Sequence, residues 1–279
     1  MGRITSRTPA QRITLGPDGG VVRRADTLAV EEPLQIRVDG TPLTVTMRTP
    51  GDDFDLALGF LVGEGLVTGA DDVKTLMHCL DEDQDGRPTY NVVDVATRPG
   101  LGLPDLGLRR SFTTTSACGV CGTTSIEDVR QRSPYDVAAD QTRWTPEALA
   151  AMPELLESAQ TGFARTGGLH GAGLFTAQGE LLVAREDVGR HNAVDKVVGW
   201  AAREHLLPLT GCVLVVSSRA SFELAQKALM AGIPCLAAIS APSSLSVQLA
   251  REAGLTLVGF LRPPRLTVYA GAERLGLSG

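Results

Sequence analysis

The chain has 279 residues, of which 43% are hydrophobic and only 4% aromatic, and its formal net charge is −6. This length suits two domains or one large one, with a core of small aliphatic side chains. The acidic balance argues against general nucleic-acid binding, which needs a basic surface. The sequence has no apolar run long enough to cross a membrane and no secretory signal, so we expect a cytoplasmic protein that binds neither nucleic acid nor membrane.

The first hundred residues predict a small α+β unit. Residues 1–20 are polar and contain Pro and Gly, so we expect a flexible arm there. Apolar and polar residues alternate on both sides of Asp39-Gly40, which predicts a β-hairpin. The other expected elements are a helix over 52–62 and strands over 73–79 and 89–95. We therefore assign residues 21–110 to a small N-terminal domain.

Two cysteines with C-x-x-C spacing, Cys118 and Cys121, follow a run of Thr and Ser and are flanked by glycines. A cysteine acts through its thiolate, and a thiol two residues away can lower its pKa or resolve a covalent intermediate. The pair alone fits half of a zinc site, a dithiol redox couple or a sulfur carrier that holds a persulfide. We assign residues 111–144 to this loop and a linker. An odd count and wide scatter argue against a disulfide framework. The remaining cysteines are predicted to be structural, because they lie in strand-like segments: Cys79, Cys212 and Cys235.

From residue 145 onward, strands and helices alternate. This order predicts an α/β domain over 145–279, with a mostly parallel sheet covered by helices on both faces. Thr145-Pro146 is typical of a helix start, and Pro153 is expected to kink that helix. A hairpin is expected over Gln178-Gly179. The other expected elements are helices over 189–205, 221–231 and 243–253, and strands over 212–216, 235–239, 255–261 and 266–269.

Three polar loops follow strands of this sheet, at the carboxyl ends where ligands bind in open α/β proteins. One loop, residues 217–221, places Ser218 and Arg219 beside a helix N-terminus, a combination that suits phosphate. Residues 240–244 repeat the arrangement without Arg, and residues 260–265 carry two guanidiniums on a Pro-Pro turn. For either loop alone, capping serines and solvated arginines are the favoured explanation. Two loops in corresponding positions favour a nucleotide or pyrophosphate site.

The densest polar cluster, residues 186–192, lies where a strand gives way to a helix. Helix capping by Asp187 explains part of it, but capping does not require Arg190 and His191. We therefore favour a functional role, with His191 as a base, a metal ligand or a phosphate donor. His170 lies in a glycine-rich segment, where a structural role and a functional one are equally consistent with the sequence.

Several of these motifs occur together, in the same order, in one known family. The Cys118–Gly122 loop, residues 186–191, residues 217–221, and residues 257–260 with Tyr269 downstream resemble the FdhD/NarQ family. The resemblance runs from about Glu31 to Glu273. It implies a sulfur carrier required for formate dehydrogenase activity. Such a protein takes sulfane sulfur from a cysteine desulfurase and passes it to the molybdenum cofactor, which then enters the catalytic subunit of formate dehydrogenase.

The resemblance also implies specific site residues. It places the persulfide on the first cysteine of the pair, Cys118, with Cys121 tuning its acidity or expelling the sulfur. It implies that residues 260–265 contact the cofactor, bis(molybdopterin guanine dinucleotide), so guanine nucleotides are expected at the same site and no permanently bound metal is expected. It further implies a homodimer and a larger domain similar to the cytidine deaminase fold. The expected cofactor-binding residues are Phe260, Leu261, Arg262, Pro263, Pro264, Arg265, Ser218, Arg219, Arg190 and His191.

Three other functions fit some of the residues. A zinc-dependent hydrolase of the deaminase fold would also use a CxxC pair, but no H-x-E precedes it here. A thiol–disulfide oxidoreductase would place the pair at a helix start near the N-terminus, whereas this pair is in mid-chain. A non-catalytic cofactor chaperone would work without either cysteine, provided that residues 262–265 remained. The carrier is our primary interpretation.

Overall fold

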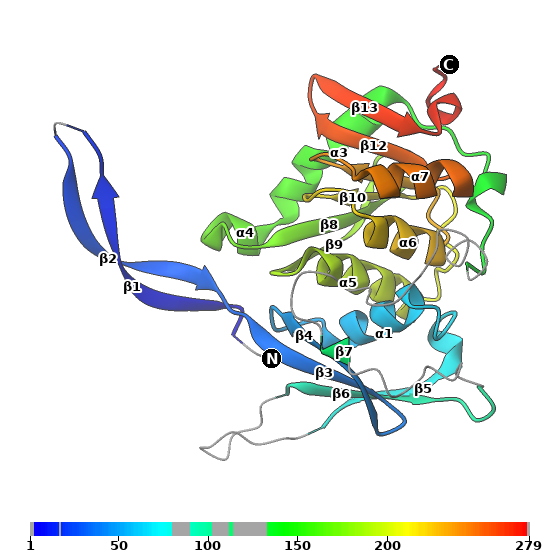
Figure 1. The fold of residues 1–279 in the computed structure, drawn as a ribbon, viewed down its shortest axis with the longest axis horizontal. Helices are drawn as coiled ribbons and strands as arrows, with labels where there is room; N and C mark the ends of the chain where they lie inside the picture. The colour runs from blue at the N-terminus through cyan, green and yellow to red at the C-terminus, as the bar shows by residue number, and fades with distance from the viewer. Residues whose placement is uncertain (1–2, 17, 80–89, 102–111, 114–132, 278–279) are drawn as a thin grey trace.

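The computed structural model describes residues 3–16, 18–79, 90–101, 112–113 and 133–277. Cys118 and Cys121 lie outside these residues. The described chain forms a mixed α/β structure with three separate sheets (Figure 1), which confirms the predicted fold class of a larger α/β unit with a smaller N-terminal α+β unit. None of the helices within the described ranges combines the length and the apolar character that crossing a membrane requires.

The N-terminal segment is a long antiparallel ribbon that projects from the body of the molecule (Figure 1). Strand β1, Thr5–Thr14, pairs along its whole length with β2, Gly20–Ala29. Most of their residues are exposed. The expected loose arm over residues 1–20 is therefore wrong for the strand segment, because the backbone N–H and C=O groups of β1 pair with β2 instead of with water.

The small sheet has the strand order β5-β6-β3-β4-β7. The predicted hairpin over Asp39-Gly40 is confirmed as an antiparallel pair of β3 and β4. The predicted helix is confirmed as α1, Asp53–Gly63, whose apolar residues are buried against the sheet and the larger unit. The strand bounds are β3 Glu32–Val38, β4 Thr41–Arg48, β5 Val73–His78, β6 Val92–Thr97 and β7 Phe112–Thr113, and a short 3-10 helix spans Ala70–Asp72.

The large sheet has the strand order β13-β12-β11-β10-β8-β9. Only β10, β11 and β12 are mutually parallel, and the remaining neighbours are antiparallel. The predicted mostly parallel sheet is thus wrong. Tight turns join β8 to β9 and β12 to β13, and a short turn can connect only antiparallel neighbours. The strands are β8 His170–Phe175, β9 Leu181–Asp187, β10 Val213–Val216, β11 Cys235–Ala238, β12 Thr256–Arg262 and β13 Arg265–Ala270.

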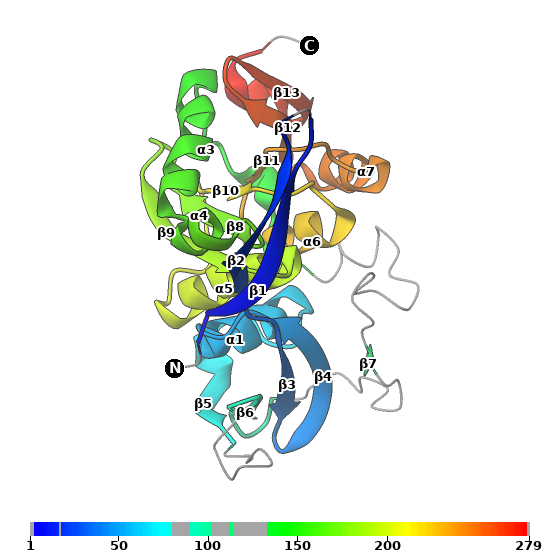
Figure 2. The same ribbon diagram turned by 90° about the vertical axis from the view of Figure 1, so that its left-hand side faces the viewer.

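Helices cover both faces of the large sheet (Figure 2). Helix α3, Pro146–Ala159, packs on one face, where Leu149, Met152 and Leu156 form a core cluster with the strands. Pro153 lies inside α3 without ending it. The helices on the other face share the main core with α1: α5 Arg190–Arg203, α6 Phe222–Met230 and α7 Ser244–Ala253. Shorter helical segments are α4 Thr161–Thr166, Val137–Ala139 and Ala272–Leu275.

Helices α1 and α5 join the two units through a close contact between glycines. A Cβ atom at Gly59 would overlap the carbonyl oxygen of Asp195, and one at Gly199 would overlap that of Asp55. The backbones of the two helices therefore approach more closely than larger residues would allow. This contact fixes α5 relative to the small unit. It also fixes the C-terminal end of the strand that precedes α5, at Asp187.

Candidate functional site

A pocket of about 870 Å³ opens at the carboxyl edge of the parallel strands. Ser217 and Ile239, which follow β10 and β11, line its floor, and residues 261–263, at the end of β12 and the start of the turn to β13, form one wall. His170, at the start of β8, lies between them and the opposite wall. The sequence predicted a ligand site at this edge. The structure brings three of the six residues predicted there, Leu261 to Pro263, into one hollow.

The β12–β13 turn is held in an unusual backbone conformation beside this pocket. Phe260 has a φ of +49°, in the left-handed region that a bulky residue rarely adopts, and its side chain is 48% exposed. The Phe260 N–H donates to the carbonyl of Ser240 at 3.1 Å, which ties the turn to the loop after β11. Strained backbone of this kind concentrates at ligand sites. Phe260, Pro264 and Arg265 are exposed and do not line the pocket.

The opposite wall comes from α3 and α4. Gln160, between the two helices, is only 5% exposed and packs so tightly on Gly171 that a Cβ at Gly171 would overlap its amide group. Nevertheless, no described residue hydrogen-bonds the side-chain amide of Gln160, which lines the pocket. Glu154 and Glu157 line the same wall and are exposed. The pocket thus places carboxylates and a free amide across from the Arg262 guanidinium.

Glu186, the first residue of the 186–192 cluster, positions this wall. Its carboxylate accepts hydrogen bonds from the backbone N–H of Gly162 at 2.8 Å and of Phe163 at 2.7 Å. These N–H groups belong to the first turn of α4, where no intrahelical partner exists. Glu186 therefore holds in place the helix whose Phe163 side chain lines the pocket.

Asp187 and Asn192 of the cluster hold the two units together. Asp187 is fully buried and lies 2.8 Å from Lys196 Nζ; it also accepts from the Thr49 N–H at 3.0 Å and from the Asn192 amide at 3.0 Å. Asn192 donates in turn to the carbonyl of Met47 at 2.7 Å. All of these groups are satisfied within the chain. The functional role that we favoured for the whole cluster does not extend to these two residues.

His191 faces α6 instead of the pocket. Its Nε2 lies 3.8 Å from Glu223 Oε2 and 3.5 Å from Ser221 Oγ. Interaction with His191, together with nearby donor groups at the start of α6, lowers the pKa of Glu223 to about 2. Burial and the positive charges of Arg190 and His191 lower the pKa of His170, so the structure brings these side chains near one another. Arg190 and His191 do not line the pocket, and the sequence analysis missed Glu223.

The two serine loops differ in what their side chains do. Ser217 Oγ accepts from the Gly171 N–H at 2.9 Å, which fixes the pocket floor. Ser243 caps α7 by accepting from the Ser246 N–H at 3.2 Å, so the capping interpretation is confirmed for that residue. Ser218 is buried and donates to the Arg219 carbonyl at 3.1 Å, and the Arg219 side chain is exposed. Neither Ser218 nor Arg219 lines the pocket.

Two of the thiols that the structure describes, Cys212 and Cys235, are in surroundings that disfavour the thiolate. Cys235 is buried, and burial raises its pKa to about 12; burial also raises the pKa of Cys212. A structural role for both is consistent with their strand positions. His78, beside Cys79, packs between Phe54 and Tyr90, with ring centroids 4.8 and 5.6 Å away, and its ring meets that of Tyr90 edge to face. Within the described ranges, no three His, Cys, Asp or Glu side chains are grouped to hold a metal ion.

Comparison with known proteins agrees with the motif order. A model of the FdhD/NarQ family matches residues 29–276. A protein named sulfur carrier protein FdhD from Streptomyces avermitilis is 57% identical over 280 residues, covering 99% of this chain and 98% of its own. A protein of the same name from Mycobacterium tuberculosis is 55% identical over 258 residues, covering 91% and 94%.

A solved structure supports the fold. A crystal structure assigned as a formate dehydrogenase accessory protein from Desulfotalea psychrophila superposes with a TM-score of 0.73 and covers 96% of this chain and 99% of its own. The two sequences are 23% identical, so the likeness concerns the fold alone.

Proposed function

This chain belongs to the FdhD/NarQ family, and on that premise we propose that it is a sulfur carrier for formate dehydrogenase. It accepts sulfane sulfur from a cysteine desulfurase as a persulfide on Cys118. It then delivers the sulfur to a molybdenum cofactor with guanine dinucleotide groups, bound at the carboxyl edge of the large sheet. The observation that carries the binding half of this proposal is the 870 Å³ pocket, with Arg262 on one wall and the unpartnered amide of Gln160 on the other.

The sulfur step needs only the two cysteines of the C-x-x-C pair. The Cys118 thiolate attacks the outer sulfur of the desulfurase persulfide; the donor S–S bond breaks, an S–S bond forms on Cys118, and the desulfurase leaves as a thiolate. Attack of the Cys121 thiolate on Cys118 Sγ expels hydrosulfide and leaves a Cys118–Cys121 disulfide. A dithiol reductant must reduce that disulfide before the next cycle.

The pocket offers partners for both ends of a guanine nucleotide. Arg262 can form fork-like hydrogen bonds with phosphate oxygens. Glu154 and Glu157 are acceptors only, which matches the N–H donors on the Watson–Crick edge of guanine. Gln160 can donate and accept from a fixed position. We therefore assign the base to the α3 wall and the phosphates to the β12–β13 turn.

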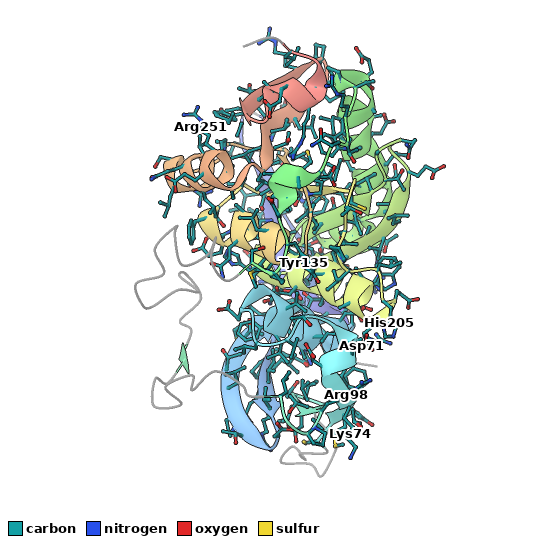
Figure 3. All side chains as sticks on the ribbon, turned by 90° about the vertical axis from the view of Figure 1, so that its right-hand side faces the viewer. Asp71, Lys74, Arg98, Tyr135, His205 and Arg251 are labelled. Atoms are coloured by element: carbon teal, nitrogen blue, oxygen red, sulfur yellow. The ribbon has the colours of Figure 1, made fainter. Side chains whose placement is uncertain are left out.

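Isothermal titration with GDP tests the binding half. We expect the full chain to bind GDP, and Arg262→Ala or Gln160→Leu to weaken binding about tenfold or more, because each removes a hydrogen-bonding group from a partly desolvated site. Arg251→Ala is the matched control, since Arg251 of α7 (labelled in Figure 3) is exposed and does not line the pocket. GDP binding that is unchanged in both pocket variants would contradict the assignment.

Restoration of formate dehydrogenase activity in cells that lack this chain separates a carrier from a chaperone. We expect Cys118→Ala to restore no activity although the purified variant still binds GDP. A chaperone that only holds the cofactor predicts full activity from the same variant.

A further inference from the structure

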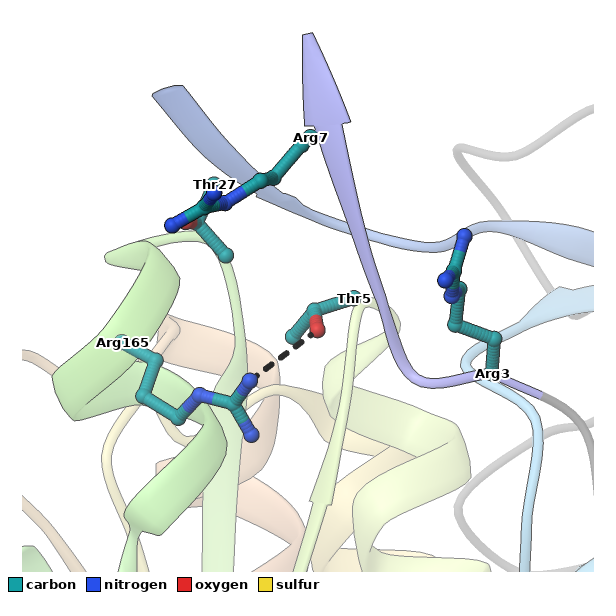
Figure 4. Close-up of a pocket in the computed structure, with 5 residues that line it drawn as sticks. All are labelled: Arg3, Thr5, Arg7, Thr27 and Arg165. Atoms are coloured by element: carbon teal, nitrogen blue, oxygen red, sulfur yellow. Dashed lines mark hydrogen bonds between the residues drawn. The ribbon is translucent and has the colours of Figure 1, made fainter. Parts of the chain in front are cut away.

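A second hollow, of about 540 Å³, lies between the N-terminal ribbon and α4 (Figure 4). Its walls consist of three arginines and two threonines: Arg3, Thr5, Arg7, Thr27 and Arg165. It shares no lining residue with the pocket at the sheet edge. The two sites nevertheless meet at α4, because this helix contributes Arg165 to one and Phe163 to the other.

The pairing of the ribbon explains why these side chains gather. Thr5 and Arg7 are two residues apart in β1, so they point to the same face. Thr27 is the direct antiparallel partner of Arg7, and cross-strand partners also share a face. Arg165 reaches this face from α4 and donates from Nη2 to Thr5 Oγ1 at 3.3 Å (Figure 4).

The hollow carries positive charge without compensation. None of its lining residues is acidic, and no described carboxylate forms an ion pair with Arg3, Arg7 or Arg165. Asp26 of β2 neighbours Thr27 in sequence and therefore faces the other side of the ribbon, where it pairs with Arg24 at 3.2 Å. In a chain with a net charge of −6, three unpaired guanidiniums around one hollow repel one another unless an anion lies between them.

We propose that this hollow binds a phosphate-bearing small molecule, with a diphosphate group as the part that is recognised. Guanidinium forks form paired hydrogen bonds with phosphate oxygens, and threonine hydroxyls donate to the same kind of acceptor. Because the arginines come from both the ribbon and α4, the bound anion bridges these two elements. The ligand thereby fixes the ribbon against the helix that forms one wall of the sheet-edge pocket.

Isothermal titration of the full chain with pyrophosphate at low ionic strength tests the site. Arg7→Gln and Arg165→Gln are each expected to weaken binding about tenfold, since each removes one charge-assisted contact. Arg24→Gln, on the opposite face of the same ribbon, is the matched control and should leave the affinity unchanged. All titrations are carried out on protein that carries Arg262→Ala, so that phosphate binding at the sheet-edge pocket does not contribute. Circular dichroism establishes that each variant is folded.

Three outcomes would show that the hollow is not a specific phosphate site. Absence of pyrophosphate binding would overturn the proposal, as would binding that survives either Arg7→Gln or Arg165→Gln, or an equal loss in Arg24→Gln, which would mean attraction to overall surface charge. Repeating the titration with GDP in the Arg262→Ala variant decides the source of the phosphate. Binding of both GDP and pyrophosphate would indicate that the hollow takes a nucleoside diphosphate. Binding of pyrophosphate alone would indicate that it takes the free anion.

Discussion

The junction between the two units and the carboxyl edge of the large sheet are built from neighbouring residues. They differ in whether their buried polar side chains have hydrogen-bond partners within the chain. At the junction, Asp187 is completely buried. Its carboxylate forms an ion pair with Lys196 and accepts hydrogen bonds from Thr49 and Asn192. At the sheet edge, Gln160 is almost as buried, but its side-chain amide has no hydrogen-bond partner among the described residues, and Phe260 is held at a positive φ. Satisfied polar groups indicate a structural role, and unsatisfied ones at a pocket are available for a ligand.

The largest expected effect is at the junction. Asp187→Ala should lower the free energy of unfolding by about 3–5 kcal/mol, because it leaves the Lys196 ammonium buried without its partner. Urea unfolding monitored by circular dichroism measures the change. Replacing both residues by apolar ones, in Asp187→Leu with Lys196→Met, should cost less than the single change. A loss below about 1 kcal/mol in the single variant would contradict the structural assignment.

A smaller loss of stability is expected from the contact between α1 and α5. Gly199→Ala should destabilise the chain by about 1–3 kcal/mol, because the added methyl group overlaps the backbone of Asp55. Backbone within a helix cannot change rotamer to relieve the overlap, so the two helices must move apart. Gly69→Ala is the matched control, since a Cβ there meets open space. Thermal unfolding of the two variants side by side should separate them, and equal melting temperatures would be the contrary result.

At the sheet edge, substitutions should change binding more than stability. Gln160→Leu keeps the apolar stem and removes an unpartnered amide, so its unfolding free energy should stay within about 0.5 kcal/mol of wild type while GDP affinity falls. Parallel urea unfolding and GDP titration give both quantities. If Gln160→Leu lowered the free energy of unfolding and left GDP affinity unchanged, Gln160 would have a structural role, which would contradict the assignment of the sheet edge to ligand binding.

The smallest effect concerns pH. The folded-state pKa of Glu223 is lowered to about 2 from its ordinary value of 4.5, so its carboxylate contributes stability that is present above pH 4.5 and is lost as pH falls toward 2. After discounting for solvent screening, that contribution is about 1 kcal/mol. Glu223→Gln should therefore flatten this part of the stability–pH curve. An unchanged curve between pH 5 and pH 2 would contradict the pairing with His191.

Local sequence patterns predicted most of the elements and the edge at which the pocket lies. The hairpin of β3 and β4 and the helices α5 to α7 follow from periodicity and turn residues that act over a few positions. The β1–β2 ribbon was missed because both strands are exposed and polar, so no apolar alternation reveals them.

The residues that the sequence analysis missed depend on tertiary contacts. Gln160 matters because Gly171 packs against it, and Glu223 because α5 brings His191 to the start of α6. The 186–192 cluster was identified as one unit, yet Glu186 positions α4 whereas Asp187 joins the two units. No spacing within the sequence distinguishes these roles, because Gly162 and Thr49, the partners that define them, lie more than 20 positions away in the chain.

The most direct test of the central claim is native mass spectrometry of the purified protein before and after incubation with a cysteine desulfurase and free cysteine. The account predicts that wild type gains one sulfur atom that dithiothreitol removes, and that Cys118→Ala gains none. Cys121→Ala should gain the sulfur and retain it. Sulfur uptake by Cys118→Ala equal to that of wild type, or a bound zinc ion that is lost when either cysteine is replaced, would contradict the carrier function.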